Sequence, residues 1–399
     1  MRSNENHILV INGGSSSIKF ALYHAGDSLF QFLGGEVENI GSNNARLNVI
    51  DSITNKKNSI RVDAKLYKNA ANFLIDWIEK EADFDSIKAI GHRIVNGLNH
   101  NNPEKITPGL LNELKKMSAY DPAHLPEEIN LIEIFQKCYP ALVQIACFDT
   151  SFHVSMPTVA KWIPIPRKYF SMGIQRYGFH GLSYSFLMEK LAELQGDKID
   201  KEKMILAHLG NGASLAAIKN GKSIDTSMGF TPTSGIPMST RTGDIDPGVA
   251  WYLLNEQKLT PKQFNHLINH ESGLLGISET DSDMRELLKR QTTDNRAEEA
   301  IELFCYQTKK WIGSFAAALG GLDTLVFSGG IGENAPEIRK RICSDLQFLG
   351  IHLDEKRNAG NEAIISPDHG KVAVRVIKTN EEWIIARLVC DVLHDYPKQ

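Results

Sequence analysis

The chain has 399 residues, of which 42% are hydrophobic and 23% are charged, and it carries a formal net charge of −4. This length favours two or three domains, and the weakly acidic balance argues against a nucleic-acid-binding or membrane-bound protein. The scattered cysteines include no CxxC pair and the N-terminus has no signal-peptide core, which predicts a cytoplasmic protein with reduced thiols.

Three apolar runs break into glycine-rich turns that carry small hydroxyl or amide residues, at residues 7–22, 204–218 and 324–338. Each pattern predicts a buried strand that ends in a turn with bare backbone N–H groups. Such groups favour anions, and phosphate above all. One such turn is weak evidence, but three in one chain suggest a polyphosphate held from several sides. The pattern therefore points to a nucleotide phosphotransferase.

The first two turns resemble each other. With Ser17 laid over Ser214, an offset of 197 residues (214 − 17), Gly13 meets Gly210. Both copies run from a strand through a glycine turn into a second apolar strand, which predicts a β-hairpin in each. A repeat spaced at half the chain predicts two similar domains that face each other across a cleft. Chance similarity between two hairpins is the alternative.

Strands and helices alternate along the rest of the chain. The spacing of apolar residues predicts helices over 66–80 and 127–138, strands over 86–95 and 142–153, and a long helix over 297–319. This alternation predicts a mixed or parallel sheet flanked by helices, with ligands beyond the carboxyl ends of the strands. The polar residues placed there are Asn12, Arg93, Asp149, His208 and Ser328.

Four polar residues in loops or at the ends of predicted strands suit phosphoryl transfer, which needs cations on the transferring group and an anchor for the acceptor. Arg93 in GHRIVNG and Arg241 in TRTGDIDPG suit bidentate binding of a carboxylate or phosphate. His180 lies in RYGFHG, and Asp149 follows an apolar strand in FDTSFH. Each also fits a structural role: a salt bridge for either arginine, core packing for His180 and a helix N-cap for Asp149.

Further motifs accompany these residues, and the whole set in chain order is NGGSSSIKF, FDTSFH, RYGFHG, HLGNGAS, DTSMGFTP, TRTGDIDPG, GGIGENAP and TNEEWIIA. With these motifs essentially the whole chain resembles the acetate kinases, within the superfamily of acetate and sugar kinases, heat-shock chaperones and actin. The resemblance implies an α/β fold of two duplicated actin-like, ribonuclease H-like domains with a central cleft. It implies an N-terminal acyl- and phosphate-binding domain (1–150 plus about 376–399) and a C-terminal nucleotide-binding and dimerisation domain (151–375) in a homodimer.

The resemblance also implies a role for each matching residue. Catalysis would involve Asp149, His180, Arg241 and Arg93, and the acyl substrate would contact Arg93, Val95, Ala123, Phe179 and Pro232. The residues expected to bind ATP or ADP are Ser15, Ser17, Lys19, His208, Leu209, Gly210, Asn211, Gly212, Asp283, Met284, Arg285, Gly330, Ile331, Gly332, Glu333 and Asn334. Asn12 and Glu381 would hold Mg²⁺, with Mn²⁺ as an alternative.

The implied reaction is a reversible, direct in-line transfer from ATP to acetate, giving acetyl phosphate without a covalent enzyme intermediate. The chain departs from the familiar pattern at Asn96 and Leu98, at Leu182 and Tyr184, and at Ala123, where leucine is common. These departures put the preferred acyl group in doubt, so a propionate or other short-chain acyl kinase is one alternative. A nucleotide-gated binding protein of the same fold is another, and it predicts a long peptide-binding region after the ATPase domains.

Overall fold

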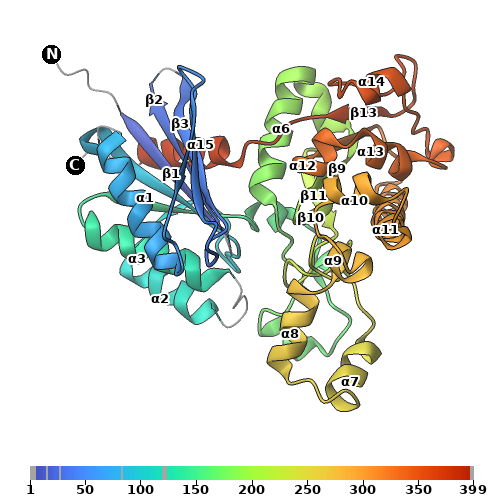
Figure 1. Cartoon of the computed structure of the whole chain (residues 1–399). Helices are drawn as coiled ribbons and strands as arrows, with labels where there is room; N and C mark the ends of the chain where they lie inside the picture. Colours follow the sequence, from blue (N-terminus) through green and yellow to red (C-terminus); the bar gives the residue numbers. More distant parts are fainter. Residues whose placement is uncertain (1–5, 15–16, 27, 82–83, 119–123, 396–399) are drawn as a thin grey trace. The chain divides into compact units, whose positions relative to one another are not determined.

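The computed structural model describes residues 6–14, 17–26, 28–81, 84–118 and 124–395 (Figure 1). The chain divides into two compact units. Unit 1 contains the described residues up to Ser151 and from Asn380 onward, and unit 2 contains Phe152–Thr379. Across the described ranges, no helix combines the length and apolar character needed to cross a membrane.

The sheet of unit 1 is formed by β5 (Lys57–Arg61), β4 (Arg46–Asp51), β3 (Leu29–Glu38), β2 (Ile18–Ala25), β1 (His7–Gly13), β6 (Ile87–Ile94), β8 (Val143–Phe148) and β7 (Glu104–Lys105), in this spatial order. Strands β1 to β5 form an antiparallel meander. Strands β1, β6 and β8 run parallel, so their carboxyl ends share one edge. The strand predicted over 142–153 ends at Phe148, because the chain turns there into a 3₁₀ helix at Ser151–Ser155.

Helices cover both faces of this sheet. They are α1 (Tyr67–Glu81), α3 (Leu125–Cys138) and α15 (Glu381–Asp395), and α2 (Pro108–Met117) packs against α3. Helix α1 buries one face because its apolar residues recur every three or four positions. Leu9 and Ile11 of β1 form one core with α1 and α3, and α15 packs against β1 and β6 (Figure 1). Strand β1 is buried along its whole length as a result.

Gly91 of β6 permits the close approach of α15. A Cβ at this position would lie 2.6 Å from Ile385 Cγ2 and 2.7 Å from Val389 Cγ2. We expect Gly91→Ala to lower the free energy of unfolding by about 1–3 kcal/mol, the usual effect of overpacking a core. Gly313→Ala is the matched control, because a Cβ there meets no atom within 4 Å. Alanine should raise the stability at that helical site by roughly 0.5–1 kcal/mol.

Urea unfolding of both variants and the wild-type protein would measure these changes. Equal stabilities for Gly91→Ala and Gly313→Ala would show that α15 can move away from β6 without loss.

The sheet of unit 2 repeats the central part of the first sheet. Its spatial order is β11 (Lys222–Thr226), β10 (Ala213–Lys219), β9 (Lys203–Leu209), β12 (Thr324–Ser328) and β13 (Ala373–Val376). Strands β9 to β11 form an antiparallel meander, and β9, β12 and β13 run parallel. This arrangement matches β3-β2-β1-β6-β8 of unit 1, which confirms the predicted duplication.

The two hairpin turns differ in length. The pair Gly13 and Ile18 closes the ladder between β1 and β2, whereas Leu209 and Ala213 close the ladder between β9 and β10. Gly210 therefore lies in the turn, although the sequence overlay places it opposite Gly13 at a strand end.

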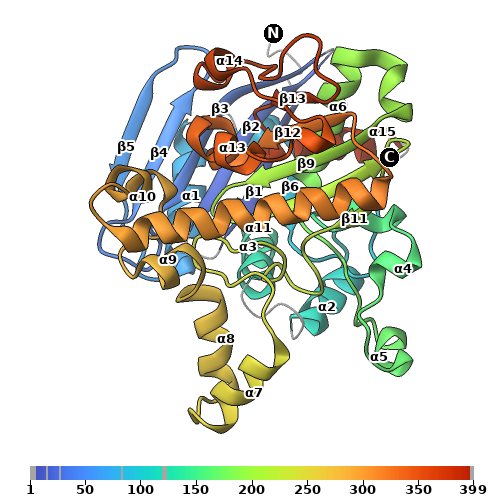
Figure 2. The same ribbon diagram turned by 90° about the vertical axis from the view of Figure 1, so that its right-hand side faces the viewer.

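The longest helix of unit 2 is α11 (Asn295–Leu319), which packs against β9 and β10 (Figure 2). It begins where the Asp294 side chain accepts the N–H of Arg296 at 3.0 Å, and it ends at Gly320 with φ of 70°. Asp294 is a typical N-cap residue, and Gly320 adopts the left-handed conformation that ends many helices.

The other helices of unit 2 are α4 (Thr158–Lys161), α5 (Arg167–Ser171), α6 (Gly181–Gln195), α7 (Pro247–Asn255), α8 (Pro261–His270), α9 (Gly273–Ser278), α10 (Met284–Arg290), α12 (Gly329–Asn334), α13 (Pro336–Cys343) and α14 (Glu355–Ala359). Further 3₁₀ helices lie at Phe84–Ser86, Gly196–Lys201 and Gln347–Leu349.

Candidate active site

The predicted site residues belong to both units. Unit 1 holds Asn12, Ser17, Lys19, Arg93, Val95, Asp149 and Glu381, and unit 2 holds the other described members of the set. Ser15 and Ala123 lie outside the described residues. In each unit several of the predicted residues lie close together near the ends of strands.

Arg93 and Asp149 meet at the carboxyl edge of the first sheet. Arg93 lies near the end of β6, and Asp149 directly follows the neighbouring parallel strand β8. Arg93 Nη2 donates to Asp149 Oδ2 at 2.8 Å, and Asp149 is fully buried. Glu128 of α3 places Oε1 3.8 Å from Arg93 Nη1, while its Oε2 accepts the backbone N–H of Val95 at 2.9 Å. The proximity expected of Arg93 and Asp149 is therefore present.

The Arg93 guanidinium is held as a cation. Burial alone would lower the pKa of Arg93, but the carboxylates of Asp149, Glu381 and Glu128 outweigh burial and raise it. Its buried Nε has no hydrogen-bond partner among the described residues. A buried donor without a partner is costly, so this nitrogen suits an acceptor supplied by a ligand.

Asn12 contacts two glutamates, Glu381 and Glu382, in the same unit as Arg93. The Asn12 amide donates to Glu381 Oε2 at 3.3 Å and to Glu382 Oε1 at 3.2 Å, since β1 ends beside the start of α15. Burial raises the pKa of Glu381 to about 7 against the opposing effect of Arg93, and Asp149 and Glu382 add to the rise. The positive charge near Glu381 therefore does not outweigh its burial.

Lys19 of β2 supplies part of that charge. Burial opposes its charged form, but Glu382, Glu36 and Glu381 together raise the pKa of Lys19. The neighbouring residue Ser17 accepts the N–H of Gly14 through its backbone carbonyl at 2.8 Å, which shapes the turn after β1.

The donor set of this cluster fits a divalent cation. Five carboxylates lie around two cations, so the acidic groups outnumber the basic ones by three (five minus two); these groups are Glu36, Glu128, Asp149, Glu381, Glu382, Arg93 and Lys19. Mg²⁺ prefers oxygen ligands and usually takes only one or two carboxylates while keeping several waters. Within the ranges that the structure describes, no set of three or more His, Cys, Asp or Glu residues is arranged as a complete metal cage. The oxygen donors of Asn12 and Glu381 are of the type that Mg²⁺ takes.

In unit 2, residues far apart in sequence converge on the turn between β9 and β10. A Cβ built on Gly212 would lie 3.1 Å from His180 Nε2 and 3.7 Å from Arg241 Nη1. A Cβ on Gly210 would lie 3.6 Å from His208 Nε2 and 3.9 Å from the backbone nitrogen of Gly330. Glycine at both positions therefore lets these neighbouring groups approach the turn closely.

His180 is oriented by its backbone and by two ring contacts. It precedes α6 in the left-handed conformation with φ of 58°, which is uncommon for a residue other than glycine. Its ring stacks on His208 with centroids 4.3 Å apart, and its Nδ1 lies 2.9 Å from Ser214 Oγ. His208 Nδ1 lies 2.8 Å from Ser183 Oγ. Both imidazoles are therefore fixed through Nδ1.

Arg241 and the unit 2 members of the predicted acyl pocket lie close to this turn. Arg241 Nη1 donates to the carbonyl of Pro232 at 3.1 Å, and Phe179 directly precedes His180 in the chain. Phe179 and Pro232 are both buried. Asn211 anchors the turn itself, because its carbonyl accepts the N–H of Ser239 at 3.2 Å. Val95 belongs to unit 1, so the complete acyl pocket stays a prediction.

The third glycine-rich stretch differs from its prediction. The strand is present as β12, but a helix replaces the predicted turn, because Gly329 (φ 76°) redirects the chain straight into α12. Glu333 Oε1 accepts the N–H of Gly329 at 2.9 Å and the N–H of Thr379 at 3.1 Å. The predicted nucleotide residues Gly330–Asn334 therefore form a short helix that Glu333 braces from within.

Asp283, Met284 and Arg285 lie at the start of α10. The Asp283 side chain caps the helix by accepting the N–H of Arg285 at 2.8 Å. Its hydrogen bonds to the Arg285 side chain lower the pKa of Asp283, so the cap stays ionised. Met284 is buried and Arg285 is exposed. Their role toward ribose and adenine stays a prediction.

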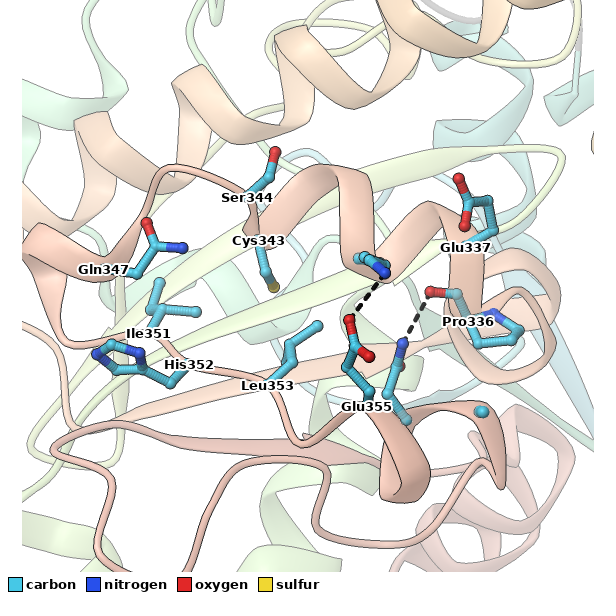
Figure 3. Close-up of a pocket in the computed structure, with 12 residues that line it drawn as sticks. Pro336, Glu337, Cys343, Ser344, Gln347, Ile351, His352, Leu353 and Glu355 are labelled. Carbon is cyan, nitrogen blue, oxygen red and sulfur yellow. Dashed lines mark hydrogen bonds and ion pairs between the residues drawn. The ribbon is translucent and has the colours of Figure 1, made fainter.

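A pocket of about 540 Å³ lies between α13 and α14 (Figure 3). Lys340 Nζ pairs with Glu355 Oε1 at 2.9 Å in its wall, and Asn358 Nδ2 donates to the carbonyl of Pro336 at 2.9 Å. Burial raises the pKa of the Cys343 thiol to about 12, so this thiol is not reactive near neutral pH. None of the predicted site residues lines this pocket.

Sequence reasoning missed Glu128 and Glu382. Glu128 is a buried carboxylate on the apolar face of α3, and such a residue in an otherwise apolar stripe is an available signal. Glu382 adjoins Glu381 in the TNEE motif, where the second glutamate gives no separate signal. Both missed residues set the charge around Arg93 and Lys19.

Comparisons with known proteins identify the same family over almost the whole chain. The family model described as "Acetokinase family" matches residues 7–387. An acetate kinase of Rhodopseudomonas palustris (strain TIE-1) is 43% identical over 396 residues, covering 96% of this chain and 97% of the relative. A solved acetate kinase of Porphyromonas gingivalis has a TM-score of 0.86 at 35% identity and covers 97% of this chain and 100% of that one. A solved propionate kinase of Francisella tularensis has a TM-score of 0.89 at 37% identity, covering 96% and 98%.

Proposed function

Since this chain belongs to the acetokinase family, we propose that it transfers the γ-phosphoryl group of ATP to acetate, giving acetyl phosphate and ADP. The convergence of His180 and Arg241 on Gly212 is the observation that best supports this proposal. Phosphoryl transfer places charge on the equatorial oxygens of a loose transition state, where a cation and a ring N–H stabilise it.

The residues of unit 1 suit the carboxylate acceptor. Arg93 is a cation whose buried Nε donates to none of the described residues, and its planar fork matches a carboxylate. Asp149 fixes the orientation of that fork through the 2.8 Å ion pair. A carboxylate oxygen attacks the γ-phosphorus while the bond to the β,γ-bridging oxygen breaks, and ADP leaves with that electron pair. The acceptor is already ionised, so the step requires no general base.

Asn12 and Glu381 would hold Mg²⁺ or Mn²⁺, which would neutralise charge on the nucleotide phosphates. We expect Glu381→Gln to raise the Mg²⁺ concentration needed for half-maximal activity at least tenfold, because one of few protein ligands is lost. The folded state should persist, since the substitution removes a buried charge from a cluster with surplus negative charge.

Metal titrations of activity would measure this change. Glu133→Gln is the matched control, because Glu133 is an exposed carboxylate of α3 paired with Lys115. An unchanged Mg²⁺ requirement for Glu381→Gln would move the metal site elsewhere, with Asp149 as the next ligand to test.

Trapping the acyl phosphate with hydroxylamine tests the function directly. The purified chain is incubated with MgATP and formate, acetate, propionate or butyrate, and the acyl hydroxamate is measured. We expect acetate to give the highest kcat/KM, with propionate within about tenfold, since one methylene is worth only about 1–3 kcal/mol of discrimination. Absence of hydroxamate with all four carboxylates would overturn the proposal.

A propionate kinase is the second candidate. The similarity to the Francisella tularensis propionate kinase favours it, as do the departures near the predicted acyl pocket. A higher kcat/KM for propionate than for acetate in the same assay would select this function.

A homodimer is also proposed on the premise of family membership. Helix α7 offers an apolar surface that a second subunit could cover, because 61% of Trp251, 51% of Tyr252 and 43% of Val249 are exposed. Light scattering of the purified chain would give the oligomeric state, and a monomer at micromolar concentration would contradict the proposal.

A further inference from the structure

Two hydrogen bonds in series link Tyr184 to the imidazole of His180 through Ser214. Tyr184 Oη lies 2.5 Å from Ser214 Oγ, and Ser214 Oγ lies 2.9 Å from His180 Nδ1. Tyr184 and Ser214 are fully buried, so water does not compete for these contacts. Tyr184 lies one turn into α6, and its backbone N–H donates to the carbonyl of His180 at 3.0 Å. Backbone and side chain therefore hold Tyr184 in one place relative to His180.

The acidity of the phenol and the hydroxyl determines which group donates in each of these two hydrogen bonds. Ser214 has one O–H donor for two neighbours, so at least one neighbour must donate to it. A phenol is a stronger acid than a serine hydroxyl and is therefore the better donor. With Tyr184 donating to Ser214, the serine hydroxyl is free to donate to His180 Nδ1. An Nδ1 that accepts leaves the proton of the neutral imidazole on Nε2.

Nε2 is the nitrogen on the side of the phosphate turn. It lies 3.1 Å from the Cβ position of Gly212, whereas Cε1 lies 3.4 Å from it. A phosphoryl oxygen can only accept, so a useful His180 must present a donor there. We propose that Tyr184 is a positioning residue which acts through Ser214 to keep the proton of His180 on Nε2. The inference rests on the proposed function, and it gives a role to one of the chain's departures from the familiar family pattern.

His208 shows what the arrangement would be without the phenol. Its Nδ1 contacts Ser183 Oγ at 2.8 Å, and Ser183 Oγ lies 2.8 Å from Thr379 Oγ1. Two aliphatic hydroxyls differ little in acidity, so acidity does not determine which of them donates to the other. The tautomer bias is therefore specific to His180, although the two rings are stacked.

Histidine-selective ¹⁵N NMR tests the tautomer without any substrate. We expect the wild-type protein to show His180 with a protonated Nε2 and an unprotonated Nδ1, the signal being assigned with a His180→Asn variant. In Tyr184→Phe, which keeps the buried ring, we expect the Nδ1–H tautomer to become populated. A wild-type His180 protonated on Nδ1 would overturn the proposal.

Kinetics test the consequence for catalysis. We expect Tyr184→Phe to lower kcat roughly tenfold to hundredfold, the range found when hydrogen-bond partners behind metal-bound histidines are removed. The KM for ATP should stay within about twofold. Ser214→Ala should lower kcat similarly. The double variant should be no worse than either single variant, because both substitutions interrupt the same series of hydrogen bonds. Additive losses would contradict the coupling.

Tyr177→Phe is the matched control, since it removes a phenol that donates to the carbonyl of Gly173 at 2.6 Å. Its kcat should match the wild-type value, and a loss equal to that of Tyr184→Phe would overturn the proposal. Failure of the proposed function is separate: the wild-type chain would then lack acyl kinase activity, while the NMR experiment would still report the tautomer.

Discussion

Arg93→Lys is expected to lower kcat/KM for the carboxylate substrate about tenfold to hundredfold, the effect of losing one hydrogen bond to a charged group. Lysine keeps the positive charge between Asp149 and Glu128 but loses the planar fork and the Nε donor. The affinity for ATP should change little, because Arg93 is not among the residues proposed to bind the nucleotide.

Arg93→Ala separates the catalytic role from the structural one. It removes the guanidinium that pairs with the fully buried Asp149 at 2.8 Å. Removing one member of a buried ion pair costs about 3–5 kcal/mol. We therefore expect Arg93→Ala to lose both activity and stability, and Arg93→Lys to lose mainly activity.

Steady-state kinetics, titration calorimetry with ATP and urea unfolding would measure the three quantities. Arg46→Lys, at an exposed position of β4, is the control and should match the wild-type protein in all of them. Near-normal turnover of Arg93→Lys would show that Arg93 only pins the strand ends.

The sequence predicted the duplicated sheets well, because their signals are local. Apolar strands followed by glycine turns identified both hairpins, and parallel strands necessarily deliver residues such as Arg93 and Asp149 to one edge. The same local signal failed at Gly329. A glycine with positive φ can close a hairpin or start a helix, and tertiary packing around Glu333 decides between the two.

Long-range polar contacts could not be predicted in this way. The link from Tyr184 to His180 depends on Ser214, which comes from a strand 30 residues further along the chain than Tyr184. The sequence does not identify which hydroxyl Tyr184 contacts. The charge around Glu381 likewise depends on four elements that meet only in the fold. The types of the residues around Glu381 do not indicate which residues, distant in sequence, become their partners.

Arg339→Met is expected to lower the free energy of unfolding by about 3–5 kcal/mol, the scale for breaking a buried polar network. Arg339 of α13 is fully buried and bonded to neutral acceptors. Nη1 donates to the carbonyls of Gly332 and Glu333 at 2.8 and 3.1 Å, and Nε donates to Asn358 Oδ1 at 2.8 Å. Methionine fills a similar volume but leaves these acceptors buried without donors.

This loss should also reach the proposed nucleotide site. Gly332 and Glu333 belong to α12, whose last carbonyls Arg339 satisfies, so a looser α12 should weaken ATP binding. Burial lowers the pKa of Arg339 to about 10, which leaves it charged at neutral pH and able to donate from all three nitrogens. Arg339→Lys retains the charge with fewer donors, and its stability should lie between those of the wild-type protein and Arg339→Met.

Arg341→Met supplies the matched control on the same helix. Arg341 pairs with Glu337 at 2.8 Å near the surface, and such pairs are worth about 0–1 kcal/mol. Urea unfolding and ATP titration of the three variants would test the contrast. If Arg339→Met unfolds at the same urea concentration as Arg341→Met, the acceptors of Gly332, Glu333 and Asn358 find other donors, and Arg339 does not hold α12 in place.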